Sequence, residues 1–219
     1  MTPTPRLRSP GLRLMLALPL LLAASACSIL GDSRQPPATV FAPDPRVQAD
    51  PSWPGVGWQL SINRPDAARM TDSLRIAVRP TPGELQVYKG AVWAKRPADM
   101  VGDAILHALE DSGRIPAVAR QGSGIAADYK LVMDLRRFES DYAGGAMPNA
   151  TIELHVNLVR TTDQGVVATR TFLQSVPAAS TAVADVADAF SRGLGQMAHE
   201  VAGWVLASGD AHQWMGHKR

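Results

Sequence analysis

The sequence contains a single cysteine and few aromatic residues. Cys27 is the only cysteine among 219 residues, and phenylalanine, tryptophan and tyrosine together make up 5% of the chain. A single cysteine excludes a disulfide framework within the chain and a zinc site built from cysteine ligands. After the first thirty residues, no apolar run is long enough to cross a bilayer as a helix. With 46% hydrophobic residues, the remaining chain has the composition of an ordinary globular protein.

Motifs for metal binding and catalysis are missing as well. The histidines form neither an H-E-x-x-H pattern nor an i, i+4 pair; they are His107, His155, His199, His212 and His217. Gly122-Ser123-Gly124 lacks the lysine of a phosphate-binding loop and is typical of a turn. Asp185 and Asp188 lie one turn apart, which is common on the solvent side of a helix. We therefore expect no enzyme activity, no metal and no cofactor.

The N-terminus is typical of a secretory signal peptide. Arg6, Arg8 and Arg13 precede an apolar run over residues 14–24, and Ala24-Ser25-Ala26 leads to Cys27. This layout predicts a lipoprotein signal peptide over residues 1–26, with diacylglycerol and an N-acyl chain attached to Cys27. Alanine at position 24 departs from the leucine that is commonest there. The alternative is an ordinary signal peptide cut after Ala26, which would leave an exposed thiol with no disulfide partner.

Removal of this segment changes the charge of the chain. The formal net charge of +2 includes three arginines of residues 1–26, and without them 19 basic and 20 acidic residues remain. The mature chain carries no clustered basic stripe, so nucleic-acid binding is not expected.

Proline density separates a linker from a folded domain. Residues 27–56 hold six prolines and little periodic apolar content, which predicts an extended tether. The alternative is a loop wrapped along the domain, in which Phe41 and Trp53 dock. The domain itself is expected over residues 57–208, and residues 209–219 are expected to form a flexible tail.

Alternation of apolar and polar residues predicts the strands. It is clearest over residues 74–78, 129–135 and 152–158, and a loop at residues 161–165 leads into a fourth strand over 166–175. Weaker strands are expected near residues 57–62, 84–88 and 115–119. In the third strand, Ile152, Leu154, Val156 and Leu158 form an apolar face opposite Glu153, His155 and Asn157.

Two helices are predicted. The first covers residues 97–112, with Pro97 at its first position and Gly113 after its end. The second covers residues 181–206 and carries a core-facing stripe: Val183, Val186, Phe190, Leu194, Met197, Val201 and Trp204. Gly193 and Gly195 cost a helix about 1 kcal/mol each relative to alanine, which predicts close packing or a bend at these positions.

The strands have one apolar and one polar face, and the second helix has an apolar face directed to the core. Together these features predict the fold class. We expect an α/β (α+β) two-layer sandwich, in which two main helices cover one face of a mixed or antiparallel sheet and leave the other face polar.

Several segments then follow one another in the order of a known family. Ser73–Val78 is followed by a segment with Tyr88, Trp93 and Pro97 ahead of a helix, then by Asp128–Leu131 leading to Phe138, and by a last helix with Trp204. In this order, the chain from Cys27 to about Leu206 resembles the ABC-type transport auxiliary lipoprotein family, which includes paraquat-inducible lipoprotein C. Tyr88, Trp93 and Pro97 are its most specific element, and core packing is the favoured role for Tyr88 and Trp93.

The resemblance implies a non-catalytic subunit of an MCE-type phospholipid transporter. The implied partner is an MCE-domain periplasmic protein of an ABC transporter, and association with further copies of the chain is a second expectation. Ser28 after the lipidated cysteine, in place of aspartate, favours the outer membrane, with the domain facing the periplasm. The polar face with Glu153, His155 and Asn157 is the candidate partner-binding surface. An envelope structural or assembly lipoprotein is the alternative from another class, and a periplasmic hydrolase is the least favoured.

Overall fold

A computed structural model of the protein describes residues 37–216, and these residues contain nine strands and two helices. The predicted signal peptide and Cys27 lie outside the described residues. The strands in chain order are β1 (Thr39–Phe41), β2 (Gln59–Ile62), β3 (Asp66–Ala67), β4 (Arg75–Arg79), β5 (Gln86–Trp93), β6 (Ala117–Arg120), β7 (Tyr129–Asp141), β8 (Asn149–Arg160) and β9 (Val166–Pro177). Helix α2 covers Pro97–Ser112 and helix α3 covers Val183–Gly216.

Strand β7 organises a mixed sheet. Along one edge it pairs in parallel with β2, then β3, then β4, and along the other edge it pairs antiparallel with β8, which in turn pairs with β9. Strand β5 is antiparallel to β4 and parallel to β1, while β6 is parallel to β2. The predicted α+β class with a mixed sheet is confirmed, and every predicted strand has a counterpart. The short strands β1 and β3 were not predicted.

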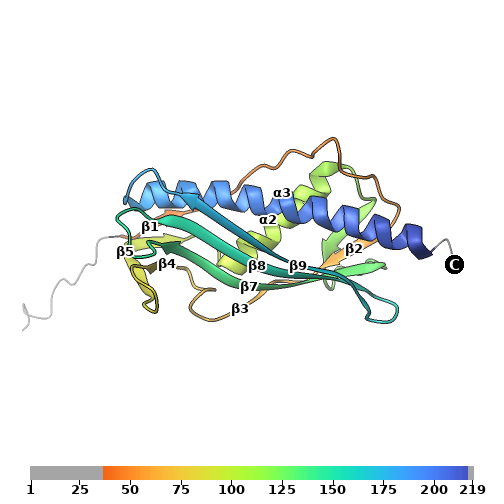
Figure 1. The fold of residues 1–219 in the computed structure, drawn as a ribbon, viewed down its shortest axis with the longest axis horizontal. Helices are drawn as coiled ribbons and strands as arrows, with labels where there is room; N and C mark the ends of the chain where they lie inside the picture. Colours follow the sequence, from red (N-terminus) through yellow and green to blue (C-terminus); the bar gives the residue numbers. More distant parts are fainter. Residues whose placement is uncertain (1–36, 217–219) are drawn as a thin grey trace, which may run out of the picture. The chain divides into compact units, whose positions relative to one another are not determined.

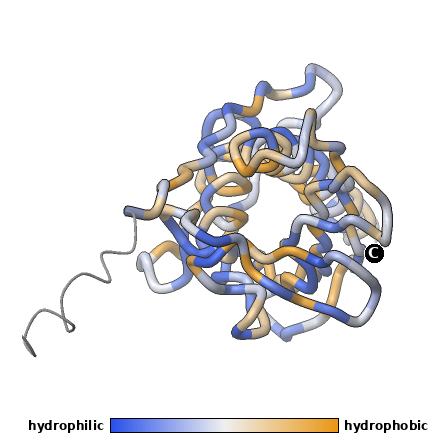
Figure 2. The backbone as a smooth tube through the Cα atoms, turned by 90° about the vertical axis from the view of Figure 1, so that its left-hand side faces the viewer, coloured by the Kyte–Doolittle hydropathy of each residue, from blue (hydrophilic) through white to orange (hydrophobic). Residues whose placement is uncertain are grey.

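Both helices lie on the same face of this sheet, with α3 running along β8 and β9 (Figure 1). Along the strands, hydrophobic and hydrophilic residues alternate (Figure 2), and the hydrophobic ones of β8 are fully buried: Ile152, Leu154, Val156 and Leu158. Helix α2 ends at Gly113, whose φ of 62° is the left-handed conformation that glycine adopts most easily. The predicted arrangement of two helices on one face is therefore confirmed. In the described part of the chain, neither helix is long and apolar enough to cross a membrane.

The predicted tether is wrong from residue 39 onward. Strand β1 belongs to the sheet, and residues 42–58, here called the strap, lie along α3 and α2 (Figure 1). Alternate residues from Phe41 to Ala49 turn inward and are half-buried, whereas the residues between them are exposed. This period of two is the alternation of an extended chain on a surface, and the prolines fit it because such a chain donates few ladder hydrogen bonds.

The predicted flexible tail is wrong over residues 209–216, because α3 continues through them. The hydroxyl of Tyr129 lies 2.9 Å from Nδ1 of His212, which ties the extension to β7. The predicted stripe of α3 is buried from Val186 to Val201. Trp204, expected in the core, is only half-buried, with its ring edge-on to Phe172 at 5.7 Å.

Candidate functional site

The polar face of the sheet lies opposite the helices. Glu153, His155 and Asn157 are half-buried there, and each is flanked along β8 by fully buried apolar residues. Nδ1 of His155 lies 2.9 Å from the hydroxyl oxygen of Thr171 on β9, and Arg136 on β7 lies 3.7 Å from the Glu153 carboxylate. The face predicted to be polar and uncovered by helices is therefore present, and its side chains are held by neighbours on both adjacent strands.

An ion-pair network lies on the same face, where β4 and β7 end. Arg79 donates two hydrogen bonds to the Glu139 carboxylate, at 2.8 and 2.9 Å. Arg137 donates to Glu139 at 2.7 Å and to Asp141 at 2.6 Å. The network has no net charge, and Glu139 at its centre is 4% exposed. Bidentate pairing of this kind is among the stronger hydrogen-bonding geometries in proteins.

These contacts shift the titration of the network. Burial alone would raise the pKa of Glu139, but the hydrogen bonds from Arg79 and Arg137 outweigh it and lower the pKa below the ordinary value of 4.5. The pKa of Asp141 is also lowered, against the effect of burial, by the backbone N–H of Ala143 and by Arg137. Both carboxylates are therefore charged at neutral pH, as the two guanidinium groups require.

Sequence analysis missed this network because β7 contains a β-bulge. Leu135 stands opposite Leu154, but Arg137 stands opposite Glu153, so the alternation of inward and outward residues shifts by one between them. The shift turns Phe138 inward and places Arg137, Glu139 and Asp141 on the outer face. Charged residues at every second position from 137 to 141 were the available signal.

Three aromatic residues of the family motif, Tyr88, Trp93 and Phe138, pack in or against the hydrophobic core. Trp93 is 2% exposed, and its ring meets Phe138 and Phe190 edge-on at 5.8 and 5.2 Å. Phe138 stacks on Phe190 of α3 at 4.5 Å. The hydroxyl of Tyr88 lies 2.9 Å from that of Ser140, and burial raises the pKa of Tyr88 to about 12. These contacts join β5, β7 and α3, so the motif forms the core where the two layers meet.

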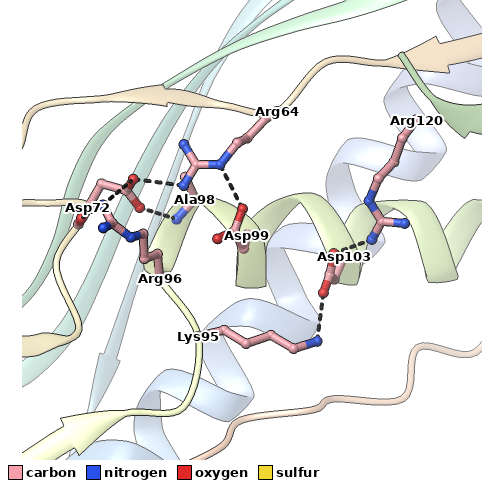
Figure 3. A network of polar contacts seen from close by, with 8 residues as sticks. All are labelled: Arg64, Asp72, Lys95, Arg96, Ala98, Asp99, Asp103 and Arg120. Atoms are coloured by element: carbon pink, nitrogen blue, oxygen red, sulfur yellow. Dashed lines mark hydrogen bonds and ion pairs between the residues drawn. The ribbon is translucent and has the colours of Figure 1, made fainter. Parts of the chain in front are cut away.

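A second polar network surrounds the start of α2 (Figure 3). Pro97 occupies the first turn, and Arg96 before it makes no side-chain cap. Asp72, 8% exposed, takes this role from 26 residues away, because its carboxylate accepts the backbone N–H of Ala98 at 3.1 Å. Arg64 donates to Asp72 at 2.8 Å and to Asp99 at 2.7 Å. The network fixes the segment before β4 to the helix N-terminus, where carboxylates are stabilised.

The same helix carries a third set of charges. Lys95 donates to Asp103 at 2.9 Å, and Arg120 on β6 pairs with the same carboxylate (Figure 3). Burial opposes the shift, but these two cations lower the pKa of Asp103. A hollow of about 230 Å³ lies beside Arg64, Asp103 and Arg120, and the charged groups in its lining already pair with one another. Because the charges are mutually satisfied, the hollow presents no free charge of one sign to a ligand.

The described residues hold no cluster of histidine, cysteine or acidic side chains suited to a metal. His199 packs against the ring of Trp53 at 4.9 Å, and His212 is engaged by Tyr129. The candidate site is accordingly the polar sheet face, and the covalent attachment site, Cys27, lies outside the described residues.

Comparison with known proteins identifies one family and two related structures. The sequence profile of the ABC-type transport auxiliary lipoprotein component family matches residues 39–202. The crystal structure of protein XCC0632 from Xanthomonas campestris, assigned to the DUF330 family, is 53% identical with a TM-score of 0.79, covering 81% of this chain and 99% of that one. An uncharacterized protein of known structure is 11% identical with a TM-score of 0.55, covering 73% and 97%, and shares the fold alone. No curated protein sequence matches the chain.

Proposed function

Because the chain belongs to the ABC-type transport auxiliary lipoprotein component family, we propose that it is a membrane-anchored accessory subunit that acts by docking rather than by catalysis. Its anchor is the acylated Cys27. Ser28 after this cysteine supports outer-membrane sorting, with the domain facing the periplasm. The transporter it serves carries phospholipid and includes an MCE-domain protein that spans the periplasm, which is the docking partner.

One observation carries this proposal: the helices cover only one face of the sheet. Glu153, His155 and Asn157 lie on the face that the helices leave open, and they are partly accessible. Polar faces also occur on domains that have no partner. The support for docking here therefore comes from the accessible polar side chains and not from an exposed hydrophobic surface. A polar interface of this kind is typical of a transient contact and weakens as salt concentration rises.

The ion-pair network at one end of the face supports a rigid docking surface. Arg79, Arg137, Glu139 and Asp141 are locked to one another, so they lose little side-chain freedom when a partner binds. Preorganisation reduces the entropy that association must overcome. Further copies of the chain are a second docking partner through the same surface.

Replacement of His155 and Asn157 by arginine tests the docking surface. The double variant is expected to reduce recovery of the MCE-domain protein when the lipoprotein is purified from envelopes. Its thermal stability should change little, because surface substitutions usually shift the free energy of unfolding by about 0.5 kcal/mol or less. Asp188→Arg, on the exposed side of α3, is the matched control and should leave recovery unchanged. Normal recovery with the double variant would place docking elsewhere, with residues 142–149 as the next candidate. A large loss of stability would show that this face is buried.

The anchor has its own test. Intact mass analysis of the mature protein from membranes is expected to show an N-terminal Cys27 that carries acyl chains, and Cys27→Ala should leave the protein unprocessed or misplaced. A soluble, unmodified species that starts at Cys27 would contradict the anchor. Density fractionation separately tests outer-membrane sorting, which recovery with the inner membrane would refute.

A further inference from the structure

The chain enters the domain at one identifiable end. Strand β1 runs parallel to β5, with Thr39 beside Ala91 and Phe41 beside Trp93. The start of β1 therefore points toward the end at which β5 begins. At that end the pairing of Val78 with Gln86 and of Asp141 with Asn149 closes two strand connections. We define this entry end by its three loops, residues 80–85, 142–148 and 178–182; Figure 2 looks onto it.

The strap shortens the connection between the anchor and the domain. Pro45 lies against Gly195, Trp53 against Gly203 and Trp58 against Gly209, so the strap is fastened to α3 at three points. Only the eleven residues 28–38 remain between Cys27 and β1. Even fully extended, eleven residues reach at most about 40 Å. The 29 residues of segment 28–56 would reach at most about 100 Å.

The chemistry of the entry end suits a phospholipid surface. Its three loops contain 18 residues, and Glu84 is the one charged residue among them. Met147 in the 142–148 loop is 46% exposed, and the residues just before it are alanine and glycine. The opposite end, where α3 ends and the 161–165 hairpin lies, carries charges of both signs: Asp128, Lys130, Asp210 and the pair of Arg160 with Asp163. Placing charged groups against the membrane costs desolvation, and the entry end brings only one such group, so the composition of its loops and the short connection favour the same end.

We propose that the entry end of the domain lies against the lipid headgroups of the membrane that holds Cys27, so that the polar sheet face stands roughly upright from the bilayer. This inference rests on the lipid anchor of the proposed function. The long strand β7 then extends from Asp141 near the membrane to Tyr129 at the distal end, where the 161–165 hairpin between β8 and β9 also lies. The domain then presents its docking surface at a fixed distance from the bilayer, because the short connection limits how far the domain can move from the membrane.

Fluorophore quenching in vesicles tests this orientation. Cys27 is acylated in the mature protein, so an introduced cysteine is the only free thiol. The labelled sites are Ala146→Cys and Thr181→Cys at the entry end and Thr162→Cys at the opposite end; all three positions are exposed. The full lipidated chain is inserted into vesicles of phosphatidylethanolamine and phosphatidylglycerol that contain a headgroup nitroxide.

Quenching at the entry end is expected to exceed that at residue 162 by at least about twofold, because the 13-residue strand β7 separates the ends by about 44 Å. Equal quenching at all three sites, or stronger quenching at residue 162, would overturn the orientation. Insertion of thirty glycine and serine residues after Asp32 should reduce the contrast, since it restores the reach that the docked strap removes; an undiminished contrast would refute the role of the short connection. Intact mass confirms acylation before each measurement, so failure of the anchor is distinguished from failure of the orientation.

Discussion

The indole of Trp58 lies directly on the backbone of α3 at Gly209, so close that a β-carbon at that position would overlap the ring. Trp58 is 1% exposed, and its ring also meets Tyr129 edge-on at 5.0 Å. Six residues earlier on the same helix, a β-carbon at Gly203 would stand 2.6 Å from Nε1 of Trp53. Glycine at these positions provides the space in which the strap is held.

Gly209→Ala is therefore expected to destabilise the protein even though alanine is the better helix former. Alanine gains about 1 kcal/mol in helix propensity, but displacement of a buried indole costs about 1–3 kcal/mol, so a net loss is expected. Gly102→Ala in α2 is the matched control, because a β-carbon there meets only Pro65 at 3.4 Å, and it should be neutral or stabilising. Urea unfolding of both variants measures the difference. A Gly209→Ala variant as stable as the control would show that the strap yields without cost.

The strap also shows where sequence reasoning succeeded and where it stopped. Regular alternation and helical stripes identified both helices and the longer strands, because those patterns repeat over many residues. Proline density was interpreted as a tether, yet Phe41, Pro43, Pro45, Val47 and Ala49 turn inward at every second position. Of the two alternatives predicted at Gly193 and Gly195, close packing or a bend, the structure shows close packing: an added β-carbon would stand 3.3 Å from Ile152 and from Pro45, respectively. The sequence pattern did not show which segment packs against each glycine of α3, because these contacts join residues that are far apart in the sequence.

The candidate site could also be predicted only in part, because some of its contacts join residues that are far apart in the sequence. The polar face with Glu153, His155 and Asn157 follows from alternation within one strand. The network around Glu139 depends on a bulge in β7 and on Arg79, which lies 60 residues earlier in the chain. The cap that Asp72 provides to α2 is likewise a contact between residues far apart in sequence, which no local pattern reveals.

Removal of the Asp72 carboxylate should destabilise the protein through α2. Asp72→Ala deletes the acceptor for the Ala98 N–H and one of the two partners of Arg64. Loss of a helix cap costs about 0.5–2 kcal/mol, and the buried donor left without a partner brings the expected loss to about 1–3 kcal/mol. Asp99→Ala removes the other partner of Arg64. The side chains of Arg64 and Asp99 are 48% and 41% exposed, so the loss of this ion pair should cost less than about 1 kcal/mol. Equal losses of unfolding free energy in the two variants would contradict the capping role.

The network around Glu139 should make stability depend on pH in the acid range. Its pKa is lowered in the folded state, so the folded protein resists protonation more than the unfolded chain does. The resulting stabilisation is present above the unfolded pKa near 4.5 and is lost as pH falls through the lower folded value. Glu139→Gln cannot lose a proton, so its free energy of unfolding should fall less than that of the unchanged protein between pH 6 and pH 3. Some fall should remain, because the pKa of Asp141 is lowered as well.

Glu110→Gln, which replaces an exposed carboxylate on α2, is the control and should stay within about 0.5 kcal/mol of the unchanged protein at neutral pH. Denaturant unfolding at several pH values supplies the measurement, and parallel pH profiles for the unchanged protein and Glu139→Gln would show that the two arginines do not hold this carboxylate in its charged form.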